Sequence, residues 1–116
     1  MIESTILKFL DEAGLDAPIY MEIPETPPDE FYILENTGQS MRDHIRTTTL
    51  AVQSYAQSME RAADLAYEMD KVILETLPEM DDVSGVRLNS LYNFTDQSTK
   101  QYRYQGVYVI THYTHY

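Results

Sequence analysis

A few side chains in this sequence are of the kinds that bind metal ions. Two of the three histidines, His112 and His115, stand three apart in a predicted strand, so they face opposite sides of it. Glu79, Asp81 and Asp82 form an acidic group, but the segment lacks the alternating ligands and the closing glutamate of a calcium loop. The sequence has no cysteine, which excludes cysteine-type zinc sites within it. We therefore expect no bound metal and no cofactor.

Catalytic motifs are missing as well. The four glycines are scattered and form no phosphate-binding loop. No serine lies in a Gly-x-Ser-x-Gly turn, and acidic residues are too numerous for any one pair to indicate acid–base catalysis. We expect no catalytic residues and a protein that is not an enzyme.

Tyrosine is the most distinctive residue type. The sequence has ten tyrosines and no tryptophan, and five of the tyrosines fall within residues 102–116. A tyrosine combines a large apolar ring with a polar tip, which suits a protein interface, but tyrosine is also a good strand former. For Tyr102 and Tyr104 an interface and a core position are both open, whereas Tyr108 is expected in the core.

The charge is strongly negative and unevenly spread. Nineteen acids against eight bases give a net charge of −11, and residues 97–116 contain no acid. Such a surface repels phosphate, which disfavours conventional nucleic-acid binding. The simple interpretation is solubility, and the functional one is a surface that DNA can pass without binding. No apolar run approaches the ~20 residues of a membrane-spanning helix, so no membrane association is expected.

Hydrophobic periodicity divides the chain into seven regular segments. The predicted helices are 2–13 and 58–77, and the predicted strands are 19–23, 31–35, 44–55, 86–94 and 102–113. The length of 116 residues fits one domain over residues 1–116, with the element order α-β-β-β-α-β-β. The class is therefore α+β.

The second predicted helix carries the clearest pattern. Ser58 can cap its start, and Pro78 ends it. An apolar stripe follows the helical period, and we expect it to pack on the sheet. The residues expected in this contact are Leu65, Met69 and Ile73 on the helix and Ile33, Leu50 and Val52 on the strands.

Several segments resemble a known family in their pattern and order. They are Phe31–Gly38 as a strand entering a Thr-Gly turn, Ile45–Ala56 as a central strand, Ser58 with Ala62, Ala63 and Leu65 at the start of a long helix, and Leu91–Asp96 with Tyr102–Tyr108 as a closing hairpin. In these features the chain resembles the tail-terminator (tail-completion, tail-to-head joining) proteins of long-tailed bacteriophages. The resemblance covers most of residues 19–113 and departs from the family at the proline-rich stretch Pro24–Glu30.

The resemblance implies a mixed, mainly antiparallel sheet packed by two helices. It implies a homo-oligomer, a hexameric ring that caps the head-proximal end of the tail tube, stops tube polymerisation and joins the tail to the head. The implied partners are further copies of the chain, the tail tube protein and a head-completion or connector protein, with DNA only passing through the lumen. The implied location is the virion, with assembly in the host cytoplasm, from a phage or a prophage.

Two polar segments are the candidate contact sites of such an assembly protein. Residues 36–43 and the acidic loop 79–85 flank the strongest regular elements, and Met and Arg are enriched at interfaces. The alternative is that both segments are solvated connections. The candidate interface residues are Asn36, Thr37, Gly38, Gln39, Met41, Arg42, Asp43, Arg46, Glu79, Asp81, Asp82, Tyr102, Arg103 and Tyr104.

Other functions remain open. A head-closure (stopper) protein would share the virion setting but have a different partner. A small regulatory module that mimics DNA would need an ordered acidic face. An enzyme subunit has no motif in its favour. Neighbouring genes for a tail tube and a tape measure would favour the tail-terminator hypothesis.

Overall fold

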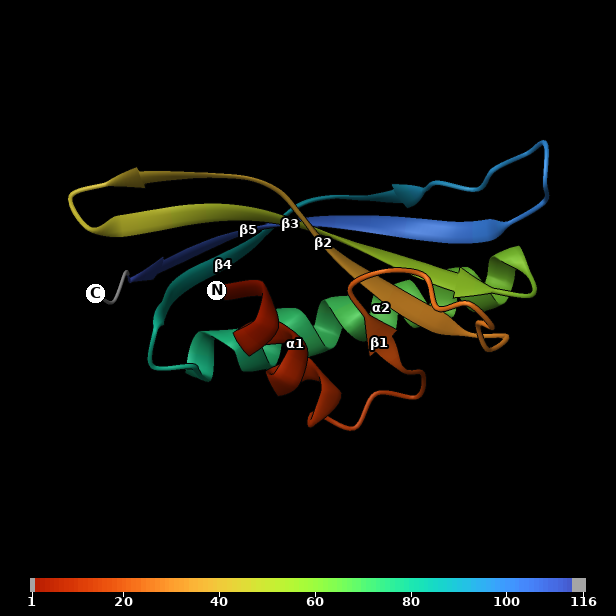
Figure 1. Ribbon diagram of the computed structural model, residues 1–116, viewed down its shortest axis with the longest axis horizontal. Coiled ribbons are helices and arrows are strands. Elements are labelled where there is room, and N and C mark those ends of the chain that lie inside the picture. Colours follow the sequence, from red (N-terminus) through yellow and green to blue (C-terminus); the bar gives the residue numbers. More distant parts are fainter. Residues whose placement is uncertain (1, 114–116) are drawn as a thin grey trace.

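The computed structural model describes residues 2–113, which form a five-stranded sheet with both helices on one face (Figure 1). The sheet order is β1-β2-β3-β5-β4, with β1 parallel to β2 and the other pairs antiparallel. This confirms the α+β class, the element order and the mixed, mainly antiparallel sheet. The elements are α1 (Ile2–Asp11), β1 (Ile19–Tyr20), β2 (Phe31–Arg42), β3 (Ile45–Ala56), α2 (Met59–Thr76), the 3-10 turn η1 (Leu77–Glu79), β4 (Val83–Asn93) and β5 (Tyr102–Tyr113).

Helix α2 forms where the sequence predicts it. The Ser58 hydroxyl accepts a hydrogen bond from the Arg61 backbone N–H at 3.2 Å, which satisfies one of the donors that a helix start leaves open. The α-helix ends at Thr76, and the chain continues as a 3-10 turn that contains Pro78. The helix buries Leu65, Met69 and other members of its apolar stripe against the sheet.

The core between the helices and the sheet confirms most of the predicted contacts. Leu50 and Val52 belong to it, but the placement of Ile33 was wrong. Tyr32 and Leu34 face the helices, while Ile33 lies on the opposite side of the sheet in a second cluster. Residues 31–34 are all apolar and all buried, so their pattern gives no sign of which alternate pair faces inward.

The proline-rich stretch is a crossover connection and not part of a hairpin. Strand β1 is shorter than predicted and pairs in parallel with β2 through Tyr20 and Ile33. Because the two strands run in the same direction, residues 21–30 must bring the chain back to the end of the sheet at which β1 begins. The Tyr32 backbone N–H donates to the Pro18 carbonyl oxygen at 2.8 Å at the start of this pairing. Helix α1 ends two residues earlier than predicted, before Gly14 with its positive φ of 81°.

Strand β5 lies in the interior of the sheet, between β3 and β4, with the predicted bounds. Its Tyr108 is buried, as expected, and the ring passes beneath Gly106 on the helix side of the strand. The Tyr108 hydroxyl donates to the Asp70 carboxylate of α2 at 2.9 Å. Burial, followed by this contact with Asp70, raises the pKa of Tyr108 well above its ordinary value. The Tyr108 ring is therefore held against Gly106 of its own strand, and its hydroxyl is held by Asp70 of α2.

Candidate interaction site

The predicted loop at residues 36–43 is not a loop, which corrects the sequence prediction. Strand β2 runs on to Arg42 and pairs with β3 as far as Ile45, so the two strands form a long hairpin. We call residues 37–48 the hairpin arm. Its turn has positive φ at two consecutive residues, 52° at Asp43 and 67° at His44. Such a two-residue turn matches the twist of antiparallel strands.

A β-bulge explains why the sequence Asn36-Thr37-Gly38 looked like a turn. The register of β2 against β3 shifts between Asn36 and Gly38, which leaves Thr37 as the extra residue. The Asn36 side-chain oxygen accepts from the Gly38 backbone N–H at 3.0 Å, and the Thr37 hydroxyl donates to the Thr49 carbonyl at 3.3 Å. Residues that are typical of turns therefore form a β-bulge inside a continuous strand.

The base of the hairpin arm contains a buried polar contact. The Thr48 hydroxyl lies 2.7 Å from Nε2 of His112, and both side chains are buried. Thr48 also lies 3.4 Å from the Gln39 side-chain oxygen. Burial lowers the pKa of His112, so the neutral ring is favoured. The contact joins the arm to the end of β5, whereas His115 lies outside the described residues.

The acidic loop lies at the same end of the molecule as the hairpin arm (Figure 1). The Tyr113 backbone N–H donates to the Asp82 carbonyl at 2.9 Å, while Tyr113 also pairs with Ile45 of the arm. Strand β4 begins at Val83, three residues earlier than predicted, so the loop proper is short. The structure thus brings the two predicted contact segments to one end.

The remaining predicted interface residues lie at the opposite end. Tyr102, Arg103 and Tyr104 open strand β5, whose other end reaches the arm. Tyr102 and Tyr104 are half-buried and pack on the helix-side core, which answers the question that their sequence left open. Arg103 points to the other face of the sheet, away from both helices.

Arg103 organises an aromatic cluster that the sequence did not predict. Its guanidinium carbon lies 4.4 Å from the centre of the Phe94 ring and 5.8 Å from that of Tyr55. Its Nε donates to the Phe94 carbonyl at 2.7 Å, and a terminal nitrogen donates to the Tyr55 hydroxyl at 3.2 Å. The Tyr55 ring stacks on Phe31 with centroids 4.6 Å apart. These residues come from strands β2, β3 and β5 and from the position just after β4, so no local spacing in the sequence indicates the cluster.

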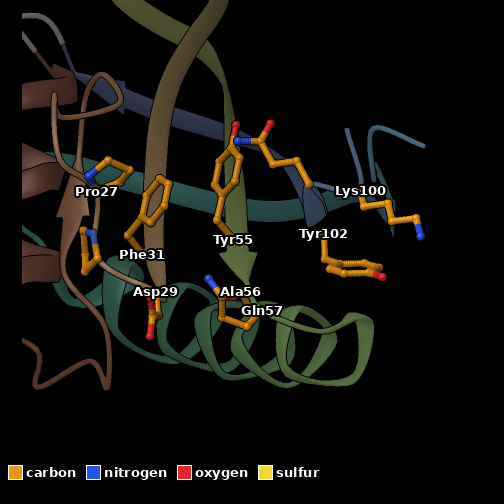
Figure 2. A pocket seen from close by; sticks show the side chains of 10 residues that line it. Pro27, Asp29, Phe31, Tyr55, Ala56, Gln57, Lys100 and Tyr102 are labelled. Carbon is orange, nitrogen blue, oxygen red and sulfur yellow. The ribbon is translucent and has the colours of Figure 1, made fainter. Parts of the chain in front are cut away.

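An open pocket of about 270 Å³ lies beside this cluster. Figure 2 shows the Phe31 and Tyr55 side chains between the proline-rich segment and the turn that carries Lys100. The lining contains one carboxylate, Asp29, and one amine, Lys100, and no nucleophile paired with a base.

The acids avoid the main strands. Strands β2 to β5 contain one acid, Glu35, and four bases. The other eighteen of the nineteen acids lie on the helices, on the 3-10 turn and in the connections. The protein therefore has a sheet that is slightly basic and a surrounding surface that is acidic. The four bases are Arg42, Arg46, Arg87 and Arg103.

Metal sites, membrane-spanning helices and matches to known proteins were also sought. Within residues 2–113, no three His, Asp or Glu side chains converge in a way that could hold a metal ion. Neither helix of that range combines the length and the hydrophobicity needed to cross a bilayer. No protein-family model matches the chain, and a search of curated proteins found no significant match.

Proposed function

We propose that the protein is a structural virion component that caps the head-proximal end of a phage tail tube as a ring, stops tube polymerisation and joins the tail to the head. The hairpin arm is the observation that carries the proposal. It extends past the helices at one end of the elongated molecule, the end at which the acidic loop also lies (Figure 1). The mixed sheet packed by two helices, which the family resemblance implies, supports the same function.

The tip of the arm has the composition of a contact surface. Met41 is 50% exposed, Ile45 is 40% exposed, and the Arg42 side chain is 94% exposed. Apolar side chains and an arginine at an exposed tip suit recognition of another protein. The arm's strands are held by backbone pairing and by the buried contact at its base, so the tip is presented on a rigid support.

The charge pattern also suits the proposed role. Monomers with a net charge of −11 repel one another and stay soluble until they meet the tail. Acids on the helices and connections repel phosphate, so any such surface that faces the lumen lets DNA slide without binding.

Arg42→Glu tests the role of the arm. We expect this variant to fold normally, because the side chain is almost fully exposed, and to give tails of uncontrolled length when it replaces the wild-type protein during infection. Reversal of the charge would weaken the contact made by the tip. Tail lengths are measured by electron microscopy, and the fold is checked by circular dichroism.

The double variant Asp81→Asn with Asp82→Asn examines the neighbouring acidic loop in the same assay. If the arm and this loop contact partners together, both variants should disturb tail length or tail joining. Normal tails in Arg42→Glu and in the loop variant would contradict the proposed role of this end. The interface would then have to lie at the tyrosine-rich end of β5.

A further inference from the structure

The sheet has two edges along which no strand pairs. Strand β1 pairs with Tyr32 and Ile33 of β2, so from Glu35 to Arg42 the outer side of β2 has no neighbouring strand among residues 2–113. Strand β4 is the last strand on the other side of the sheet. Figure 1 shows these two edges on opposite sides of the sheet at the end that carries the hairpin arm. An open edge presents backbone N–H and C=O groups with which a further strand can pair.

We propose that the two edges pair with each other between copies of the chain, with β4 of one copy beside β2 of the next. Strands β2, β3, β5 and β4 are successive antiparallel neighbours, so β4 runs opposite to β2. A second copy placed beside the first in the same orientation therefore brings its β2 antiparallel to β4, which continues the pattern of the sheet. This inference rests on the proposed function, since it names the seam at which copies in a ring meet.

The register within one copy indicates which residues meet at this seam. We call two residues level when successive strand pairs join them across the sheet. Gly38 is level with Arg87, and Ser40 is level with Gly85. All four positions lie on the sheet face away from the helices, so the alternation of the two edges matches without a slip of one residue. Neither edge contains a proline that would interrupt the pairing.

The charged residues at the arm end of the seam are opposite in sign. Arg42 is level with Tyr113 of its own copy, and the Tyr113 backbone N–H donates to the Asp82 carbonyl oxygen. Arg42 of one copy therefore lies beside Asp82 of the next when level residues meet. The Arg42 side chain is 94% exposed and can reach across the seam.

Glu35 and Arg87 form a second opposite pair. Glu35 is level with Ser90, and Arg87 is the next residue on that face because the register of β4 shifts between Leu88 and Ser90. Such diagonal neighbours are within reach of a long side chain. Residues 35–42 and 82–90 contain no other charged residue, so every acid of the two edges meets a base. This agreement favours a second copy of the chain over an unrelated strand.

The pairing is head-to-tail. The two edges differ, so each copy keeps one open β2 edge or one open β4 edge after it joins a neighbour. Such an interface can close into a ring, whereas an interface between identical edges ends at a dimer.

Cross-linking tests the seam, because the sequence has no cysteine of its own. The test variant carries Ser40→Cys and Gly85→Cys together. Ser40 is exposed and a Cβ built at Gly85 meets no atom within 4 Å, so the fold should be kept. Within one copy the two strands are three strand spacings apart, roughly 14 Å, which exceeds the ~7 Å limit between the Cα atoms of a disulfide.

Across the seam the same two positions are within bonding range, since level residues of antiparallel strands have Cα atoms about 4.5–5.5 Å apart. We expect mild oxidation to give a ladder of covalently linked chains, seen by gel electrophoresis without reductant. The matched control carries Gln39→Cys with Gly85→Cys. The Gln39 side chain lies on the helix side of the sheet near Thr48, so its cysteine points away and should link about tenfold less.

Charge exchange in the cross-linking variant tests the register. Arg87→Glu places two glutamates at the seam and should lower the yield of linked chains several-fold. Adding Glu35→Arg restores an opposite pair and should restore the yield. Lys8→Glu makes the same charge change as Arg87→Glu on the exposed side of α1 and should leave the yield unchanged.

The oxidation is carried out both in solution and on protein bound to tail tubes. The inference is overturned if no ladder forms in either setting, if the Gln39→Cys control links as well as the test variant, or if charge exchange gives no recovery. Bound rings that do not cross-link would leave the proposed function intact. The proposed function fails separately, if tails keep their normal length without this protein.

Discussion

Leu65→Ala should lower the free energy of unfolding by about 2–5 kcal/mol. Leu65 is 1% exposed and lies on the face of α2 that packs against the sheet, in the main core cluster. Removing its side chain leaves a cavity that the surrounding strands and helix can fill only in part. For a domain of this size the melting temperature should fall by roughly 10 °C, which thermal denaturation followed by circular dichroism will measure.

Leu74→Ala is the matched control for this change. Leu74 lies on the same helix but is 37% exposed, so truncation removes less buried surface and should cost under about 1 kcal/mol. Equal melting temperatures for Leu65→Ala and wild type would show that α2 buries a different face.

Gly106→Ala should also destabilise the protein strongly, by about 1–3 kcal/mol. A Cβ atom at Gly106 would lie 2.8 Å from Cε2 of Tyr108 and 3.0 Å from its hydroxyl oxygen. The ring cannot swing aside easily, because it is buried in the core and its hydroxyl is bonded to Asp70. The free energy of unfolding is measured by urea denaturation monitored by fluorescence.

Gly85→Ala provides the comparison within the same sheet. No heavy atom lies within 4 Å of a Cβ built at Gly85, on the edge strand β4. We expect a change of no more than about 0.5 kcal/mol there. If both variants were equally stable, Tyr108 would not occupy the space beneath Gly106.

The elements with a hydrophobic pattern that extends over many residues, helix α2 and strand β5, could be predicted from the sequence. Helix α2 has a capping serine, a sustained apolar stripe and a proline near its end, and these local signals agree with one another. Strand β5 alternates clearly, with Tyr108 and Ile110 on the buried side, and its bounds were correct.

The errors arose where local signals were ambiguous. Asn36 and Gly38 are typical of turns, but here they form a bulge within β2, because the threonine-rich strand β3 supplies a continuous pairing partner. In residues 31–34 both faces are buried, so the sequence has no alternation from which to choose the inward side of Ile33.

The candidate site could be predicted only in part. The sequence predicts contact segments at residues 36–43 and 79–85, and that role stays a prediction. Their position at one end of the molecule depends on the pairing of β5 with β3 and β4. The cluster of Arg103 with Phe94, Tyr55 and Phe31 joins three strands and the residue that follows β4, and only the completed sheet brings those residues together. Contacts of this kind depend on topology and leave no local pattern.

We propose that this protein forms a ring on one end of the tail tube. Electron microscopy of purified protein mixed with purified tail tubes tests this proposal. The proposal predicts six-fold rings, each seated at a single end of a tube, and tubes that no longer grow when tube protein is added. Protein spread along the tube walls, or tubes that remain bare and keep growing, would contradict it.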